Sequence, residues 1–252
     1  MSELAGKHIH IAGGSRGIGA AAVRLAAGQG ARVSFTYLSN KSKADDLVQE
    51  LARDGHQVAA YACDLAVEGA LDKASDAAVA ALGPLDGMVV SAGIFEAKPI
   101  AEMTVEFWER TMSINLRSTF LAVKAAARHM RAGKKGGSIV IYTSTAGQRG
   151  SSIYSAYATS KGAQILFMRS MAQELAPDRI RVNCIAPSWT ETEMSTAVMD
   201  GIGRQKILEG CPLGRVGLPA DVANATLFLL SDLAAFITGT TVTVDGGIDM
   251  RG

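Results

Sequence analysis

The stretch Ile11-Ala12-Gly13-Gly14-Ser15-Arg16-Gly17-Ile18-Gly19 runs from a short apolar segment directly into a helical pattern. Its glycines permit a tight turn and let backbone N–H groups approach an anion at the start of the helix. The order strand, glycine turn, helix predicts that the turn holds a pyrophosphate. The spacing is Gly-x-x-x-Gly-x-Gly, which differs from the Gly-x-Gly-x-x-Gly fingerprint. A glycine-rich loop without a ligand is the alternative, and the strand–turn–helix context argues against it.

Outward from this turn, short apolar runs alternate with longer helical patterns. Nearly continuous apolar strands are expected when helices cover both faces of a parallel sheet. We therefore predict an α/β fold of the Rossmann type, a doubly wound parallel sheet of about seven strands with helices on both faces, as one domain over residues 1–252. The strands are expected at 8–12, 32–37, 57–62, 87–91, 138–143, 181–185 and 240–244. The helices are expected at 17–29, 43–54, 68–82, 105–132, 154–176 and 221–230, with 190–218 irregular or weakly helical.

Composition narrows the class of protein. Apolar residues make up 48% of the 252 residues, and the formal net charge of +1 gives no indication of nucleic-acid or membrane binding. The three cysteines are widely spaced, so neither disulfides nor a zinc site is expected and a reducing cytoplasm is the natural compartment. No signal-peptide pattern and no membrane-spanning stretch is predicted, and no metal site is expected.

Tyr157 and Lys161 are four residues apart, a spacing that places both side chains on one face of a helix. An ordinary tyrosine has a pKa of about 10 and transfers protons poorly at neutral pH. A neighbouring cation favours the phenolate and brings the pKa of Tyr157 closer to the working pH. The pair alone is a weak signal, because the same spacing occurs by chance in many helices.

The chain as a whole resembles the short-chain dehydrogenase/reductase (SDR) family, and 3-oxoacyl-(acyl-carrier-protein) reductases within it. The glycine turn is similar to Thr-Gly-x-x-x-Gly-Ile-Gly, with Ala12 in place of Thr. Val90-Ser91 replaces two asparagines, one of which stabilises the sheet in the family, and Ser188 replaces the glycine of a Pro-Gly pair. Ser144 precedes Tyr157 by 13 residues, which is the family spacing. Other matches are Asp64-Leu65, Asn115, Pro187, Thr192 and Val244-Asp245-Gly246-Gly247.

The resemblance implies catalysis by Asn115, Ser144, Tyr157 and Lys161. Tyr157 would protonate a developing alkoxide, Ser144 would polarise the carbonyl, Lys161 would also bind the nicotinamide ribose, and Asn115 would hold a water in a proton path. Cofactor contacts are expected from the turn, from two further strand ends and from the segment after residue 185: Gly13, Ser15, Arg16, Gly17, Ile18, Gly19, Asp64, Leu65, Ser91, Ala92, Gly93, Tyr157, Lys161, Pro187, Thr190 and Thr192.

The end of the second strand indicates which cofactor is used. NAD-dependent enzymes usually carry a carboxylate there, but this chain has Tyr37 at that position and no acid before Asp45. A cation in the turn, Arg16, and the donors Ser39, Asn40 and Lys41 suit a 2′-phosphate, so NADP(H) is expected and NAD(H) less so. The alternative is that Arg16 and Lys41 merely face solvent.

Two reacting bonds are compatible with the sequence, because Tyr154 lies seven residues before Lys161 and shares its helix face. That spacing resembles the enoyl reductases, which reduce a carbon–carbon double bond, whereas the glycine spacing favours ketone reduction. A non-catalytic NADP(H)-binding sensor or scaffold is a further alternative, disfavoured by the intact Ser/Tyr/Lys set. The segment 188–214 is expected to cover the substrate. The substrate pocket is expected to involve Ser144, Gln148, Tyr154, Trp189 and Met194.

Two interactions with other proteins are expected by resemblance. The long helices and their alanine-rich faces predict a homotetramer. The basic cluster Arg128, Arg131, Lys134 and Lys135 would dock an acyl carrier protein, although a solvated helix end is the plainer interpretation.

Overall fold

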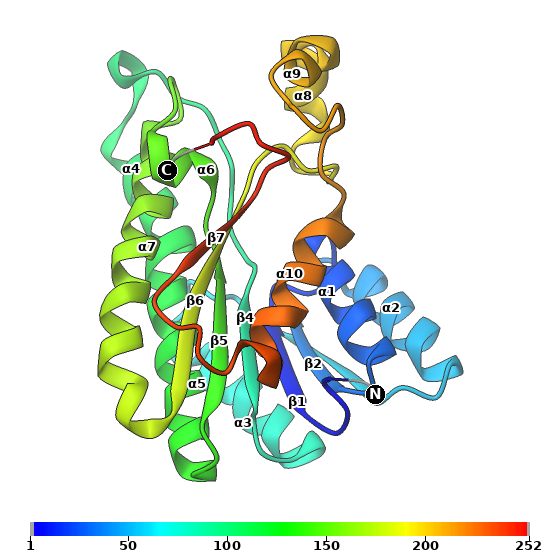
Figure 1. Ribbon diagram of the computed structural model, residues 1–252. Helices are drawn as coiled ribbons and strands as arrows, with labels where there is room; N and C mark the ends of the chain where they lie inside the picture. Colours follow the sequence, from blue (N-terminus) through cyan, green and yellow to red (C-terminus); the bar gives the residue numbers. More distant parts are fainter. Residues whose placement is uncertain (1–2, 251–252) are drawn as a thin grey trace.

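A parallel sheet of seven strands forms the centre of the computed structural model, which describes residues 3–250 (Figure 1). The spatial order is β3-β2-β1-β4-β5-β6-β7. All seven predicted strands are present and the doubly wound fold is confirmed. Their bounds are β1 His8–Ala12, β2 Arg32–Tyr37, β3 Val58–Ala62, β4 Gly87–Val90, β5 Gly137–Tyr142, β6 Ile180–Pro187 and β7 Thr241–Val244.

Helices cover both faces of this sheet (Figure 1). One face packs against α1 (Gly17–Gly28), α2 (Lys41–Arg53) and α10 (Pro219–Leu230). The other packs against α3 (Ala70–Leu82), α5 (Ser118–Gly133) and α7 (Ser155–Leu175). Because the strands are buried on both faces, their sequences are almost continuously apolar and show no alternation.

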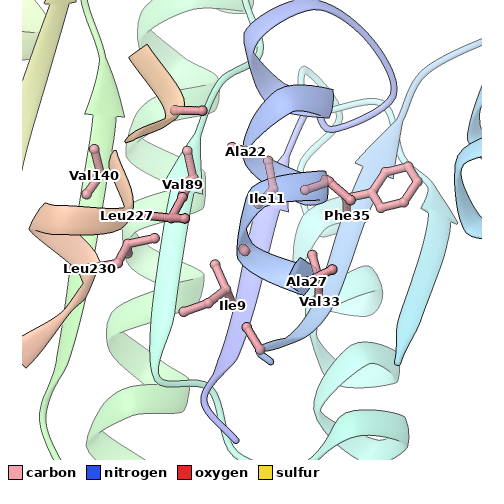
Figure 2. Packing of buried hydrophobic residues seen from close by; sticks show 14 of the residues in the cluster. Ile9, Ile11, Ala22, Ala27, Val33, Phe35, Val89, Val140, Leu227 and Leu230 are labelled. Carbon is pink, nitrogen blue, oxygen red and sulfur yellow. The ribbon is translucent and has the colours of Figure 1, made fainter. Parts of the chain in front are cut away.

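The core on the α1 face is built from β-branched strand residues and alanine-rich helix faces. Figure 2 shows Ile9, Ile11 and Val33 of the sheet beneath Ala22 and Ala27 of α1. Small helix residues let α1 lie close to the sheet, and each fully buried Ile or Val contributes about 1.5–3 kcal/mol. This packing fixes the start of α1, and therefore the glycine turn, relative to β1.

A polar network lies on the opposite face of β1. The Ser34 hydroxyl is 2.8 Å from Nε2 of His8 and 2.7 Å from Nδ1 of His10. Because His8 Nδ1 bonds to the carbonyl of Gly83, the chain of donors runs from His10 to Ser34 to His8 to Gly83. Nε2 of His10 is left buried and without a partner among the described residues. Burial lowers the pKa of His10 to about 3.

The predicted long helix 105–132 is interrupted. It forms α4 (Val105–Met112), a π-helical turn (Ser113–Arg117) and α5. Hydroxyls of Ser118 and Thr119 donate to the carbonyls of Ile114 and Asn115, and Gln164 Nε2 also donates to the carbonyl of Asn115. These side-chain donors compete with the regular helical hydrogen bonds and widen the turn.

Several short helices had no signal in the sequence analysis. Within residues 190–218, expected to be irregular or weakly helical, the structure has α8 (Thr196–Ile202) and α9 (Arg204–Glu209). A further helix, α6 (Thr145–Arg149), begins where the Ser144 hydroxyl accepts from the Ala146 N–H at 3.1 Å. Single 3₁₀ turns lie at Ile100–Glu102, Ala176–Asp178 and Asp232–Ala234.

The strand order creates one point where the chain leaves the sheet in opposite directions. From β1 it continues to β2 on one side, whereas from β4 it continues to β5 on the other. In sheets of this kind, the crevice at the carboxyl ends of such strands is the usual ligand site. The glycine turn follows β1, and Ser91 follows β4, so both lie at this crevice.

Candidate active site

A cavity of about 490 Å³ opens at the carboxyl ends of the strands. Three of the four predicted catalytic residues, Ser144, Tyr157 and Lys161, line it. The lining also includes most of the predicted cofactor residues, namely Gly13, Ser15, Arg16, Gly17, Ile18, Tyr37, Asp64, Leu65, Ser91, Ala92, Gly93, Pro187, Thr190 and Thr192. Residues far apart in the sequence are thus brought to one cavity.

The glycine turn is shaped by the close approach of backbone atoms. A Cβ at Gly13 would lie 2.9 Å from atoms of Ala92, and one at Gly19 would lie 2.1 Å from the carbonyl oxygen of Gly13. Gly17 has a φ of 54°, and a Cβ added there would lie 3.4 Å from the methyl group of Thr192. Gly19 is buried beneath the turn and does not line the cavity. Its role is to let α1 start directly under Gly13.

Close packing of two helices brings Ser144 to Tyr157. A Cβ at Gly147 would lie 2.6 Å from the backbone of Lys161, so α6 lies directly on α7 only because residue 147 is glycine. The Thr143 hydroxyl also donates to the carbonyl of Lys161 at 2.6 Å. Ser144 is thereby placed near enough to the Tyr157 phenol for its hydroxyl to favour a lower pKa of that phenol. The 13-residue spacing in the sequence corresponds to proximity in the fold.

The pKa shifts of Tyr157 and Lys161 differ from the prediction. Burial raises the pKa of Tyr157, and the hydrogen bond with Ser144 opposes that rise. The expected lowering by Lys161 is not seen, since Lys161 Nζ lies 5.8 Å from the ring centroid of Tyr157 and donates to the carbonyl of Tyr142 at 2.8 Å. Burial also lowers the pKa of Lys161 to about 8. Each buried group disfavours its own charged form.

Asn115 supports the site from behind the cavity and is not part of its lining. Its side chain accepts from the Ile94 N–H at 2.8 Å and donates to the Ile94 carbonyl at 3.0 Å and to Ser160 at 3.1 Å. A Cβ at Gly93 would meet Asn115 Oδ1 at 3.1 Å and Lys161 Nζ at 3.5 Å. Asn115 therefore fixes the segment after β4 beside Lys161, as a positioning residue.

Besides Asn115, four predicted residues outside the turn lie away from the cavity lining. Ser39, Asn40 and Lys41 are exposed, and the Asn40 side chain caps α2 while Lys41 pairs with Asp45 at 2.6 Å. Gln148, expected in the substrate pocket, hydrogen-bonds to Thr243 at 3.2 Å. The other pocket candidates, Tyr154, Trp189 and Met194, do line the cavity.

A carboxylate at the mouth of the cavity joins two cations. Glu193 forms an ion pair with Lys43 and lies 3.9 Å from the guanidinium of Arg16. Lys43 was not predicted, because only its position in the first turn of α2, opposite residue 193, brings it there. Nothing in the sequence indicates that Lys43 and Arg16 approach the same carboxylate, because the two residues are far apart along the chain.

Phe95 is the main site residue that the sequence analysis missed. It stacks on Tyr154 with ring centroids 4.5 Å apart, and it is in edge-to-face geometry with Tyr157 and Trp189 at centroid distances of 4.9 Å and 6.1 Å. Its position just after Ala92-Gly93, at the end of a strand that leads to the site, was the available signal.

A parallel sheet with a glycine turn at its crossover point and a Ser/Tyr/Lys group beside it defines a dinucleotide-dependent oxidoreductase. A family model described as enoyl-(acyl carrier protein) reductase matches residues 12–249. Curated relatives include a 3-oxoacyl-(acyl-carrier-protein) reductase of Aquifex aeolicus, 36% identical over 98% of both chains. A cyclopentanol dehydrogenase of Comamonas sp. is likewise 36% identical over 98% of both chains.

Solved structures agree with these sequence relatives. A short-chain type dehydrogenase/reductase from Mycobacterium ulcerans superimposes with a TM-score of 0.92 at 34% identity, covering 97% of this chain and 90% of that chain. One from Brucella melitensis gives a TM-score of 0.92 at 33% identity over 99% of both chains. The chain belongs to the short-chain dehydrogenase/reductase family, whose oxidoreductases use nicotinamide cofactors. Between residues 3 and 250, no helix has the length and apolar character needed to cross a membrane.

Proposed function

We propose that this protein is an NADP(H)-dependent ketoreductase that interconverts a ketone, or a 3-oxoacyl group, and a secondary alcohol. The observation that carries the proposal is that Ser144, Tyr157 and buried Lys161 line one cavity, with Ser144 close enough to influence the pKa of Tyr157. The relatives named as 3-oxoacyl reductase and cyclopentanol dehydrogenase support the same reaction class.

The residues present fit a dinucleotide. Backbone N–H groups of the Gly13–Gly17 turn, at the start of α1, suit a pyrophosphate, and no acidic residue lies in the first turn of this helix. Lys161 would hold the nicotinamide ribose, and Thr190 and Thr192 would lie near its amide. The bound nicotinamide supplies the hydride, while this chain supplies position and a proton.

Tyr157 donates its phenolic proton to the alkoxide oxygen that develops on the substrate. Because burial raises the pKa of Tyr157, the phenol is protonated at neutral pH, as carbonyl reduction requires. Ser144 donates a hydrogen bond to the same oxygen and stabilises its negative charge. A positioned acid of this kind contributes about 10²–10⁴ in rate.

The preference for NADP(H) rests on Arg16 and Lys43. Both cations approach Glu193, which lines the cavity together with Arg16 and Tyr37. Tyr37 occupies the position where NAD-dependent enzymes usually carry a carboxylate. Exchange of Glu193 for a 2′-phosphate would keep both cations paired. Lys41, by contrast, is already paired with Asp45 and is not part of this proposal.

Reduction of a carbon–carbon double bond is the second candidate, favoured by the description of the matching family model. Against it, Tyr154 is engaged in a stack with Phe95, whereas Tyr157 has the hydroxyl contact with Ser144. A sensor or scaffold without activity would not need that contact.

Assembly and location follow from the resemblance. We propose a homotetramer in the cytoplasm that acts on a small molecule and binds no nucleic acid. An acyl carrier is less well supported, since Arg128 pairs with Asp72 and Asp76, and Arg131 pairs with Asp178, within the chain itself. Light scattering at micromolar concentration would test the tetramer.

The experiment that tests the reaction class compares cyclopentanone, a 3-oxoacyl thioester and an enoyl thioester as substrates with NADPH and with NADH. We expect ketone or 3-oxoacyl reduction, with kcat/KM about tenfold higher for NADPH, since one charge-assisted pair is worth about 1.4 kcal/mol or more. Faster reduction of the enoyl thioester would contradict the reaction class, and equal efficiency with NADH would contradict the cofactor preference.

A further inference from the structure

The substrate end of the cavity has an aromatic wall, formed by Phe95, Tyr154 and Trp189. Phe95 and Tyr154 are nearly parallel, with an interplanar angle of 9°, and Trp189 meets Phe95 edge-on at 75°. The three residues come from three separate segments, after β4, before α7 and after β6. All three line the cavity, and the edge of Phe95 also contacts the ring of Tyr157. The wall therefore begins at the proposed proton donor.

Flat apolar groups are the natural ligands of such a wall. Aromatic rings prefer offset stacking or edge-to-face contact, worth about 0.5–1.5 kcal/mol beyond their buried area, which corresponds to a few-fold to about tenfold in affinity. A substrate ring would extend the existing stack while its carbonyl reaches Tyr157 and Ser144. An open aliphatic chain would fill the same space without these ring contacts.

A cation that has no partner among the described residues lines the same cavity. Arg149, the last residue of α6, lines the cavity between Ser144 and Tyr154 in the sequence (α6 in Figure 1). Most other arginines of the described chain are paired with a carboxylate or a backbone carbonyl, as in the pairs of Arg24, Arg110, Arg204 and Arg215. No ion pair or hydrogen bond of the Arg149 guanidinium is found within residues 3–250.

The two acidic residues that line the cavity interact with other groups. They are Asp64, whose carboxylate accepts from the N–H of Ala66, and Glu193, which pairs with Lys43 and lies near Arg16 at the cofactor mouth. Within residues 3–250, neither of these lining carboxylates pairs with Arg149, so its guanidinium fork is open to a ligand. A planar guanidinium of this kind suits a carboxylate held by two parallel hydrogen bonds.

We propose that the substrate is a ketone with a flat apolar ring and an anionic group, a carboxylate in the simplest case, on the side of the ring remote from the carbonyl. The ring lies against the aromatic wall and the carboxylate binds Arg149. This inference rests on the proposed ketoreductase function and specifies its substrate class. It makes Phe95 and Arg149 specificity-determining residues, with no part in proton transfer.

Four matched probes test the proposed substrate class: 4-acetylbenzoate, its methyl ester, 4-oxopentanoate and the methyl ester of 4-oxopentanoate. Dissociation constants are measured by calorimetry on the protein loaded with NADP⁺, so that no turnover occurs. We expect 4-acetylbenzoate to bind about tenfold more tightly than its ester and several-fold more tightly than 4-oxopentanoate. The preference for acid over ester should also weaken as salt is added, because Arg149 is exposed.

Variants assign the two preferences to their residues. Arg149→Gln should remove the preference for acid over ester, and Phe95→Leu should reduce the preference for the aromatic acid over 4-oxopentanoate. Arg53→Gln is the matched control, because Arg53 is exposed on α2, remote from the cavity lining, and should leave all four constants unchanged. Circular dichroism checks that each variant is folded.

Several results would overturn the inference. These are equal binding of acid and ester, an unchanged acid preference in Arg149→Gln, equal binding of ring and chain, or no binding of any probe. The proposed function fails separately: if 4-acetylbenzoate binds with the expected pattern but neither it nor any ketone is reduced with NADPH, the ligand class stands and the reaction does not.

Discussion

The glycine turn after β1 and the catalytic group, which lies at the start of α6 and on α7, line the same cavity but are built in opposite ways. In the turn, the absence of side chains matters, because a Cβ at Gly13 or Gly19 would collide with neighbouring backbone. In the catalytic group, buried polar side chains are held by specific hydrogen bonds, as Lys161 is by the carbonyl of Tyr142. The first region should therefore be sensitive to added volume, and the second to lost polarity.

A large effect is expected from the loss of the buried amine in Lys161→Met. We expect kcat to fall by about 10³, within the range for a group that assists proton transfer. The free energy of unfolding at pH 7 should change by less than about 2 kcal/mol. The lost hydrogen bond costs about 1–3 kcal/mol, and removal of a charge that the fold disfavours offsets it. Kinetics and urea unfolding measure the two quantities, with the exposed Lys124→Met as the control.

The pH dependence of that variant sharpens the comparison. The pKa of Lys161 is about 8 in the folded protein and 10.5 ordinarily, so the unfolded chain binds more protons between these values. Stability of the wild type should therefore rise with pH from about 8 to 10.5, by up to roughly 3 kcal/mol. The Met variant should lack this rise. An identical pH dependence in both proteins would contradict the burial of a cationic amine.

In the glycine turn, the corresponding change is Gly19→Ala. Its Cβ would lie 2.1 Å from the carbonyl oxygen of Gly13 and 3.0 Å from the Ser91 hydroxyl, so the turn must shift. We expect the dissociation constant for NADPH to rise more than about tenfold, with a loss of about 1–3 kcal/mol in stability. Calorimetry and urea unfolding measure these effects.

Gly28→Ala is the matched control for the turn, because it adds the same methyl group at the far end of α1. Nothing lies within 4 Å of its Cβ. The dissociation constant for NADPH should be unchanged, and the free energy of unfolding should rise by up to about 1 kcal/mol, since alanine favours the helix. If Gly19→Ala and Gly28→Ala had the same effects on NADPH affinity and stability, the turn would not depend on close backbone contact.

The smallest effect is expected at His10, a buried polar group that has no part in the site. The unfolded chain protonates this histidine near its ordinary pKa of 6.5, whereas the folded protein resists protonation until about pH 3. Stability is therefore lost as the pH falls below 6.5, by roughly 2 kcal/mol between pH 7 and pH 5. The His10→Asn variant should lose correspondingly less over this range in urea unfolding. Equal losses of stability in the wild type and the variant would show that His10 does not contribute to this pH dependence.

Sequence reasoning succeeded where the signal is local. The glycine turn, all seven strands and the Ser144/Tyr157/Lys161 spacing each depend on a few neighbouring residues, and the structure brings them to one cavity. The break in the helix at Asn115 was missed, because it depends on Gln164, which lies 49 residues further along the chain.

The remaining misses have the same cause. Phe95 and Lys43 belong to the site because they contact residues 154 and 193, respectively. Neither contact is indicated by a hydrophobic period or a sequence motif. The predicted effect of Lys161 on the pKa of Tyr157 assumed that a spacing of four residues implies interaction. The fold instead directs Lys161 Nζ to the carbonyl of Tyr142, and burial governs both groups.

The most direct test of the central claim, that Tyr157 is the proton donor, compares Tyr157→Phe with Tyr154→Phe in NADPH-dependent ketone reduction. Both changes remove one hydroxyl from the same cavity and keep the ring that contacts Phe95. We predict that Tyr157→Phe lowers kcat by about 10³ or more while NADPH binding is retained, and that Tyr154→Phe keeps kcat within a few-fold of the wild type. Wild-type turnover in Tyr157→Phe, or its loss in Tyr154→Phe alone, would contradict the assignment.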